Sequence, residues 1–268
     1  MQATAFAKIN LALHVRARRA DGYHELETLY AFLDDGDRLT VEIAARDTLR
    51  TVGEFGGALT DPFGNIVAKA LGRLPRPEGW SVVLDKRLPV AAGIGGGSAD
   101  AAAIFRLVDE RLGLPADAFE RAAALGADVP ACIASEACVG RGIGTGLAPV
   151  VNDLGGTPVL LVNPRVPLST AQVFAAWGGS DDGAMPAGTA REIALAGRNG
   201  LEAPAIALCP AISQVLDALR ATDPLLARMS GSGATCFALY ESAEAIAAAA
   251  RDIARLQPDW WQLSARMR

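Results

Sequence analysis

The stretch Pro89-Val90-Ala91-Ala92-Gly93-Ile94-Gly95-Gly96-Gly97-Ser98-Ala99-Asp100 lies between an apolar run, residues 80–84, and a helical pattern over residues 101–112. Four glycines in the five positions from 93 to 97 allow the backbone to turn tightly and to approach a ligand closely. A helix that opens directly after them directs unpaired N–H groups and the positive end of its dipole at the turn. The stretch therefore predicts an anion site, most often for phosphate, with the Ser98 hydroxyl at the helix start.

The glycine stretch alone does not identify its ligand. A flexible turn capped by Ser98 is as compatible with the pattern as a phosphate loop. A Walker loop would end in Gly-Lys-Ser/Thr, and the stretch contains no lysine. A dinucleotide fingerprint requires an acidic residue about 20 residues further on, and neither Glu110 nor Asp117 has that spacing. The stretch fits neither standard template, so the ligand that it binds must be inferred from other parts of the sequence.

Length and composition indicate a globular chain of one or two domains. The 268 residues are 51% hydrophobic and 21% charged, which is ample for a packed core. A net charge of −5 argues against general nucleic-acid affinity. No basic-then-apolar leader opens the sequence and no run approaches the ~20 apolar residues of a membrane span, so we expect a cytoplasmic protein that binds no membrane. The cysteines form no Cys-x-x-Cys pair, and no metal site is expected.

Two polar positions stand in apolar surroundings. Alternation over residues 5–16 predicts a strand that places Lys8, Asn10 and His14 on one face, which could be a solvated surface or could line a site. Asp128 precedes a helical pattern and could be its N-cap. Because residues 129–133 are apolar, Asp128 could instead be a carboxylate near the core that needs a partner, and Lys8 is a candidate.

The remaining patterns predict an α+β chain. The opening is predicted as an antiparallel meander, with turns at residues 19–24 and 34–37 between strands 5–16, 26–33 and 38–44. At the first turn, Tyr23 and His24 could stack on a planar ligand or simply cover the sheet edge. Further predicted elements are helices 65–74, 115–125, 169–177, 190–197, 211–222 and 242–256, a hairpin at 139–150, and strands 80–88, 158–162, 235–240 and 260–266. We place a domain boundary between residues 1–153 and 154–268.

Three stretches together resemble the GHMP small-molecule kinases. They are Ala7-Lys8-Ile9-Asn10, the loop at residues 89–99, and Ser230–Ala234, and their order and separations match across nearly the whole chain. ADGYH at 20–24 and LGADVP at 125–130 narrow the resemblance to members that phosphorylate an erythritol derivative carrying a cytidine diphosphate group, in the non-mevalonate route to isoprenoid precursors. The family implies a two-domain GHMP kinase fold with the active-site cleft between the domains, and a left-handed β-α-β crossover that connection rules would not predict.

The resemblance also implies roles for individual residues. Lys8 and Asp128 match the catalytic pair. The implied ATP-binding residues are Asn65, Lys86, Pro89, Val90, Ala91, Ala92, Gly93, Ile94, Gly95, Gly96, Gly97, Ser98 and Ala99. The implied substrate-binding residues are Asn10, Tyr23, His24, Tyr30, Thr170 and Phe174. ATP and Mg²⁺ are expected as cofactors, although no carboxylate dedicated to the metal is identified, and the expected state is a monomer or homodimer.

Some positions depart from the family pattern. Ala91-Ala92 stand where relatives often have glycines, Ala99-Asp100 where Ser-Asn is common, and Tyr30 where phenylalanine is frequent. Residues 178–200 match poorly, so no role is carried over to them. Two other functions are weighed against the resemblance: a GHMP kinase for another alcohol, such as mevalonate, homoserine or a sugar, and a non-enzymatic module that binds nucleic acid.

Overall fold

The structure is a computed structural model that describes residues 1–59, 61 and 64–268. The described residues form two compact units. Unit 1 comprises Met1–Lys8, Asp35–Val90 and Gly95–Ser135, and unit 2 comprises Ile9–Asp34, Ala91–Ile94 and Glu136–Arg268. The strands β1 (Gln2–Arg18) and β2 (His24–Ala44) contribute residues to both units. The units therefore do not divide the chain at residue 153, and the expected boundary between residues 1–153 and 154–268 stays a prediction.

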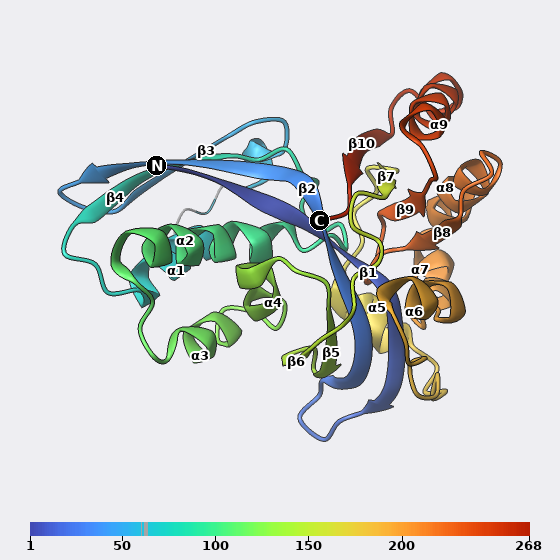
Figure 1. Ribbon diagram of the computed structural model, residues 1–268, viewed down its shortest axis with the longest axis horizontal. Helices are drawn as coiled ribbons and strands as arrows, with labels where there is room; N and C mark the ends of the chain where they lie inside the picture. The colour runs from blue at the N-terminus through green and yellow to red at the C-terminus, as the bar shows by residue number, and fades with distance from the viewer. Residues whose placement is uncertain (60, 62–63) are drawn as a thin grey trace. The chain divides into compact units, whose positions relative to one another are not determined.

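Unit 1 consists of a sheet with helices beside it (Figure 1). The second half of β2 pairs antiparallel with β4 (Gly79–Asp85), and β3 (Thr48–Val52) pairs parallel with β4. In β4, Trp80, Val82 and Leu84 are buried and the residues between them are half-buried, as a strand period of two requires. The helices of unit 1 are α1 (Ile66–Arg73), α2 (Gly96–Leu112), α3 (Ala118–Ala123) and α4 (Val129–Ala134), with a 3-10 turn at Gly56–Ala58. Because α2 packs against both α1 and α4, its beginning holds a fixed place in the unit.

The turn predicted at residues 34–37 is wrong, because β2 continues through these residues without a break. Gly36 explains the difference. A Cβ at this position would collide with the backbone carbonyl of Ala5, so the absence of a side chain lets the two strands approach closely. Asp37 is fully buried, and its Oδ1 accepts hydrogen bonds from the backbone N–H groups of Arg87 and Leu88. Glycine and aspartate usually mark a turn, but here Gly36 and Asp37 make contacts inside a continuous strand.

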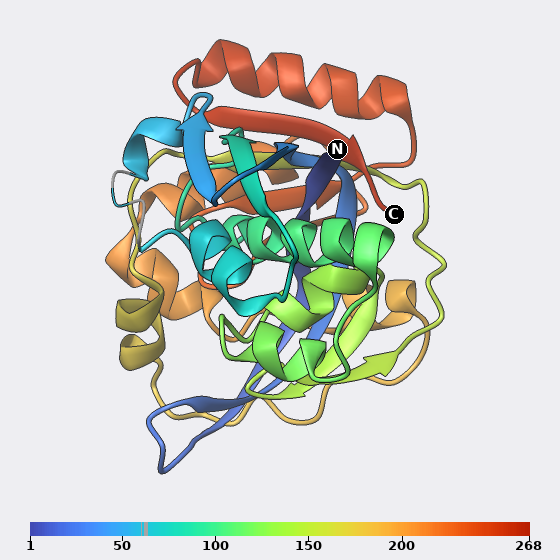
Figure 2. The ribbon, with the colours of Figure 1, turned by 90° about the vertical axis from the view of Figure 1, so that its left-hand side faces the viewer.

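Unit 2 contains an antiparallel sheet with the strand order β10, β7, β9, β8. Its strands are β7 (Pro158–Asn163), β8 (Leu226–Met229), β9 (Cys236–Leu239) and β10 (Trp261–Arg266). Every residue of β7 and β9 is buried, because α8 (Ala211–Arg220) and α9 (Ala243–Leu256) pack against this sheet. Figure 2 shows α9 lying along β10. Unit 2 also holds the first half of β2, which pairs with β5 (Cys138–Gly142), and β5 in turn pairs with β6 (Gly146–Pro149). Its remaining helices are α5 (Thr170–Ala176), α6 (Ala190–Ala196) and α7 (Glu202–Leu208).

Most predicted elements are confirmed within a few residues, among them β1, the β5–β6 hairpin, β7, α5, α9 and β10. The elements β3, α7 and β8 are not predicted from the sequence. The two strands are only five and four residues long, and each owes its conformation to its pairing partner rather than to its own pattern. The helix after the glycine stretch begins at Gly96 rather than at residue 101, since the last glycines already form its first turn. No helix in the described ranges is long and apolar enough to cross a membrane.

Candidate active site

The glycine stretch forms a sharp turn into the first residues of α2. Gly93 and Gly95 have φ values of 77° and 62°, in the left-handed region that glycine adopts at little cost. Gly95 is the N-cap residue of α2, and among the described residues no side chain caps this helix end. The first turn, which begins with Gly96 and Gly97, contains no acidic residue. The positive end of this 17-residue helix is therefore suited to an anion.

Two glycines of the turn lie against lysine side chains within unit 1. A Cβ at Gly95 would lie 2.8 Å from Cε of Lys8. A Cβ at Gly96 would lie 2.9 Å from Nζ of Lys86. A Cβ at either position would force the lysine beside it to shift, so the glycines leave room for both lysine side chains at the start of α2. The glycine stretch and the lysine of β1 thus belong to one site.

Lys8 and Asp128 form an ion pair within unit 1, with Nζ of Lys8 2.8 Å from Oδ2 of Asp128. The side chain of Lys8 is 4% exposed and that of Asp128 is 30% exposed, so the carboxylate is open to a small ligand. Asp128 stands at the N-cap position of α4, but its side chain makes no capping hydrogen bond with any described residue. Asp128 therefore occupies the predicted N-cap position, but its carboxylate pairs with Lys8 and does not cap the helix.

Lys86 lies in a buried charge cluster at the start of α2. Its ammonium group forms ion pairs with Asp37 and with Oδ2 of Asp100, the latter at 2.8 Å, and all three residues are at most 2% exposed. Burial together with the nearby charge of Asp37 raises the pKa of Asp100 to about 8, although Lys86 acts in the opposite direction. The cluster therefore holds one lysine against two buried aspartates, and the pKa of Asp100 is raised. The structure places Lys86 next to the glycine stretch, as the resemblance implies, but with its ammonium group already occupied by carboxylates.

Asn65 is the N-cap of α1. Its Oδ1 accepts a hydrogen bond of 2.9 Å from the backbone N–H of Val67. Its Nδ2 is buried and has no hydrogen-bond partner within residues 1–59, 61 and 64–268. A buried amide donor of this kind normally has a partner. The role as a nucleotide contact, implied by the resemblance, stays a prediction.

In unit 2, the second glycine loop connects Asn10 to the middle of the glycine stretch. The hydroxyl of Ser230 donates to the carbonyl of Gly93 at 2.8 Å and accepts from the backbone N–H of Asn10 at 3.2 Å. The Asn10 amide Nδ2 donates to Thr28 Oγ1 at 2.8 Å. Both Ser230 and Asn10 are buried. One residue from each of the three segments that carry the resemblance therefore takes part in this hydrogen-bonded group: Ser230, Asn10 and Gly93.

An aromatic group surrounds His24 in the same unit. The ring of Phe174 lies 4.9 Å from the imidazole, centroid to centroid, and the ring of Trp177 lies 5.5 Å away in an edge-on arrangement. Nε2 of His24 is buried and lacks a hydrogen-bond partner in the part of the chain that the structure describes. Burial, followed by the charge of Arg18, lowers the pKa of His24, so its ring is neutral at neutral pH. Tyr23 is 60% exposed beside this group, so its ring is available to a ligand.

Trp177 was not identified from the sequence, although it follows Phe174 at the three-residue spacing that places two side chains on one helix face. Of the other predicted substrate contacts, Thr170 is exposed at the start of α5, and its hydroxyl lies 2.9 Å from that of Ser232. Tyr30 is 2% exposed, and its hydroxyl donates to the carbonyl of Gly144 at 3.4 Å. In this structure Tyr30 is a packing residue of the β2–β5 pair, and its role toward substrate stays a prediction.

Comparison with known proteins gives the class of this site. The description "GHMP kinases N terminal domain" matches residues 64–136, and "GHMP kinases C terminal" matches residues 186–258. A crystal structure of a mevalonate kinase from Methanococcus jannaschii shares the fold, with a TM-score of 0.64 at 13% identity over 100% of this chain and 98% of that one. The chain is thus a GHMP-type small-molecule kinase.

More similar relatives define the family. Proteins from Novosphingobium aromaticivorans and Erythrobacter litoralis, both named 4-diphosphocytidyl-2-C-methyl-D-erythritol kinase, are 64% and 60% identical to this chain. The matches cover 100% and 97% of this chain, and 93% and 97% of those proteins. A crystal structure of 4-(cytidine 5'-diphospho)-2C-methyl-D-erythritol kinase superposes with a TM-score of 0.80 at 33% identity, over 99% of both chains. The chain belongs to the family of 4-diphosphocytidyl-2-C-methyl-D-erythritol kinases. This membership implies ATP as the phosphoryl donor and a small molecule as the acceptor.

Proposed function

We propose that the chain transfers the γ-phosphoryl group of ATP to the 2-hydroxyl of 4-diphosphocytidyl-2-C-methyl-D-erythritol, giving the 2-phosphate and ADP, in the non-mevalonate (MEP) pathway to isoprenoid precursors. The observation that carries this proposal is the ion pair of Lys8 and Asp128. A lysine and a carboxylate joined beside the uncapped start of a helix form a suitable set of groups for moving a proton and a phosphoryl group. The names of relatives that are 60% and 64% identical support the choice of acceptor.

Asp128 acts as the general base in this proposal. The acceptor oxygen forms a bond to the γ-phosphorus, the bond between that phosphorus and the β–γ bridging oxygen breaks, and the hydroxyl proton passes to the Asp128 carboxylate. Lys8, at 2.8 Å, keeps this carboxylate ionised before the transfer. Its ammonium group also stabilises negative charge on the acceptor oxygen and on the transferring group. Since phosphoryl transfer needs little covalent help, most of the acceleration comes from position and charge.

The nucleotide phosphates bind at the start of α2 in this proposal. Backbone N–H groups from the stretch Pro89–Ala99 and the hydroxyl of Ser98 hold the β- and γ-phosphates. The absence of an acidic residue from the first turn of α2 supports this assignment, because a carboxylate there would compete with phosphate. Asn65, whose amide donor is buried, and Lys86 complete the nucleotide side.

Mg²⁺ is expected to accompany the nucleotide. Protein sites for this ion usually combine one or two carboxylates with substrate phosphates. Across residues 1–59, 61 and 64–268, no group of three His, Cys, Asp or Glu side chains could hold a metal ion. The described residues therefore do not fit a metal site of their own, and the ion would be held mainly by the nucleotide.

The cytidine group of the acceptor binds at the aromatic group of unit 2. The unpartnered Nε2 of His24 pairs with the edge of the base, while Tyr23 and Phe174 stack on its faces. A neutral imidazole suits this role because cytosine itself is uncharged at neutral pH. Asn10 and Thr170 supply polar contacts to the rest of the acceptor, and Tyr30 lines the site.

Steady-state kinetics test the catalytic pair. Asp128→Asn and Lys8→Ala should each lower kcat by about 10²–10⁴-fold, the usual effect of losing a general base or its partner. Asp117→Asn is the matched control, because Asp117 also stands at a helix N-cap without a capping hydrogen bond from its side chain to any described residue. Turnover of either catalytic variant within a few-fold of the unchanged protein would show that the assigned roles are wrong.

Substrate kinetics test the base pocket. His24→Ala should raise KM for the cytidyl substrate and leave KM for ATP unchanged. An equal rise in both values would rule out this assignment. A panel with mevalonate and homoserine as alternative acceptors identifies any other alcohol that the enzyme prefers.

A further inference from the structure

Three basic side chains stand at alternate positions of β1. His14, Arg16 and Arg18 lie on one face of the strand, because successive side chains of a strand point to opposite sides. All three contact residues 175–183, which include the end of α5 and the segment that follows it. We call these three residues the β1 latch. No role for Arg16, Arg18 or the segment after Trp177 is predicted from the sequence.

Arg18 holds the end of α5. Its Nη2 donates hydrogen bonds of 2.8 Å to the carbonyl oxygens of both Ala175 and Trp177. The last carbonyls of a helix have no partner within the helix and carry its negative end, so a guanidinium group satisfies and stabilises them. The helix held in this way is only seven residues long and carries Phe174. Fixing its last turn therefore fixes two of the rings around His24.

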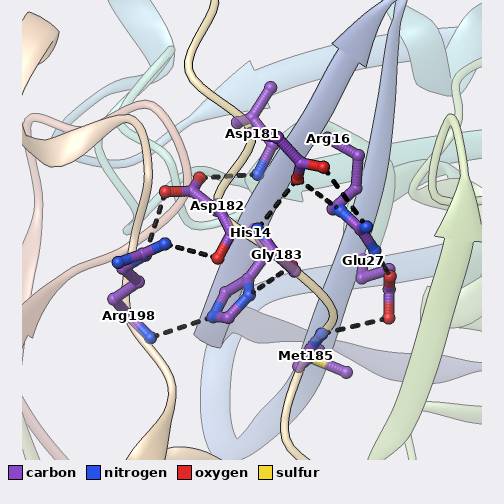
Figure 3. Close-up of polar contacts among 9 residues, drawn as sticks. His14, Arg16, Glu27, Asp181, Asp182, Gly183, Met185 and Arg198 are labelled. Atoms are coloured by element: carbon purple, nitrogen blue, oxygen red, sulfur yellow. Dashed lines mark hydrogen bonds and ion pairs between the residues drawn. The ribbon is translucent and has the colours of Figure 1, made fainter.

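Arg16 holds the segment beyond the helix (Figure 3). Its Nε lies 2.6 Å from Oδ1 of Asp181, and its other side pairs with Glu27 on β2. Glu27 in turn accepts a hydrogen bond of 3.3 Å from the backbone N–H of Met185. Asp181 thus contacts Arg16 directly, and Met185 contacts Glu27, the ion-pair partner of Arg16.

His14 and the backbone of β1 complete the anchorage. Nε2 of His14 accepts a hydrogen bond of 3.3 Å from the backbone N–H of Arg198, so its proton must lie on Nδ1, which donates to the carbonyl of Gly183 at 3.1 Å. Asp182 pairs with Val15 through its backbone N–H and through Oδ2, at 3.0 and 2.8 Å. His14 itself is 4% exposed, and its two hydrogen bonds are part-buried. Residues 181–183, which follow α5, therefore each contact β1.

We propose that the β1 latch, and Arg18 above all, positions Phe174 and Trp177 against His24 and so sets the affinity of the enzyme for the cytidine group of its acceptor. This inference rests on the proposed function, since it assumes that the aromatic group binds cytosine. Arg18 is a positioning residue: it contacts the backbone that carries the rings. Its charge has a second effect in the same direction, because together with burial it lowers the pKa of His24 and keeps the imidazole neutral.

Kinetics of Arg18→Gln test the proposal. The variant should raise KM for the cytidyl substrate roughly tenfold, as expected when hydrogen bonds from a charged donor are lost. KM for ATP and kcat should stay within twofold of the unchanged enzyme, because no nucleotide contact depends on α5. Arg18→Lys, which keeps the charge and a single donor nitrogen, should recover part of the loss. Arg251→Gln on α9 is the matched control, an exposed arginine of the same unit, and should change neither KM.

A second variant and a binding measurement separate the possible failures. Asp181→Asn weakens the latch at Arg16 and should raise the same KM, by a smaller factor. Calorimetry with cytidine 5'-diphosphate should show the weakening without any turnover. If the unchanged enzyme neither binds this probe nor phosphorylates the cytidyl substrate, the proposed function itself fails. If the unchanged enzyme does both, and Arg18→Gln either keeps its KM or loses ATP and acceptor affinity equally, the positioning role is refuted.

Discussion

The buried cluster of Lys86, Asp37 and Asp100 makes folding stability depend on pH in an unusual direction. Burial and Asp37 raise the pKa of Asp100 from 3.8 to about 8, so the folded chain keeps a proton that the unfolded chain releases above pH 4. A raised folded-state pKa gives stability that is fully present below the unfolded pKa and is lost as pH rises toward 8. With a difference of about one bound proton, the loss is about 1.4 kcal/mol of unfolding free energy per pH unit.

Asp100→Asn removes this contribution, because an amide has no proton to release in this range. Asparagine has nearly the same shape, and it leaves Lys86 paired with Asp37 alone. The unfolding free energy of the variant, relative to the unchanged protein, should therefore rise by about 1.4 kcal/mol for each pH unit between 5.5 and 7.5. The difference cancels the pH dependence of the groups that do not interact with Asp100.

Equilibrium urea unfolding, followed by far-ultraviolet circular dichroism at pH 5.5, 6.5 and 7.5, measures the effect. Asp217→Asn, at an exposed carboxylate of α8, is the control and should run parallel to the unchanged protein. Parallel curves for Asp100→Asn would show that Asp100 is ionised in the folded chain.

Substitutions at three further positions test local features of the fold. Ala91→Gly should raise the unfolding free energy by about 0.5 kcal/mol in urea titrations, because Ala91 has a φ of 53°, and the left-handed strain of about 1 kcal/mol exceeds the added chain entropy. Asn65→Ala should lower the unfolding free energy by about 1 kcal/mol through loss of the α1 N-cap, whereas Asn65→Asp should preserve most of it. Arg228→Leu should cost about 3–5 kcal/mol, seen as a large fall in Tm, because the buried guanidinium serves the carbonyls of Leu11, Ala194 and Gly197. An unchanged Tm for Arg228→Leu would contradict that reasoning.

The parts of the site that could be predicted from the sequence are those fixed by short stretches. The glycine stretch, with its helix directly behind it, was predicted because backbone freedom and helix polarity are local properties. The pairing of Lys8 with Asp128 was also predicted, from the need of a carboxylate near the core for a partner. Of the two interpretations of Asp128, the structure gives it the helix-start position and also the contact with lysine.

The features that were missed depend on contacts between distant segments. Residues 34–37 resemble a turn, but the close approach of Ala5 and the burial of Asp37 keep them in a strand. Arg18 has no local signal, since its partners lie about 160 residues further along the chain. Trp177 could have been found by helical spacing from Phe174, but its proximity to His24 could not. Local patterns therefore predicted the glycine turn and a partner for Asp128, and left out the residues that hold the aromatic group in place.

The alternation of β1 has a consequence for how the sequence can vary. Asn10, His14, Arg16 and Arg18 occupy even-numbered positions of the part of β1 that lies in unit 2, so Asn10 and the latch lie on the same face of the strand. One inserted or deleted residue near Ala12 would rotate every later side chain to the opposite face. Such a change would place Asn10 and the latch on opposite faces while leaving the strand as apolar as before. In a library of single-residue insertions, β1 should therefore tolerate almost no change of length, although substitutions at exposed Ala17 should be accepted.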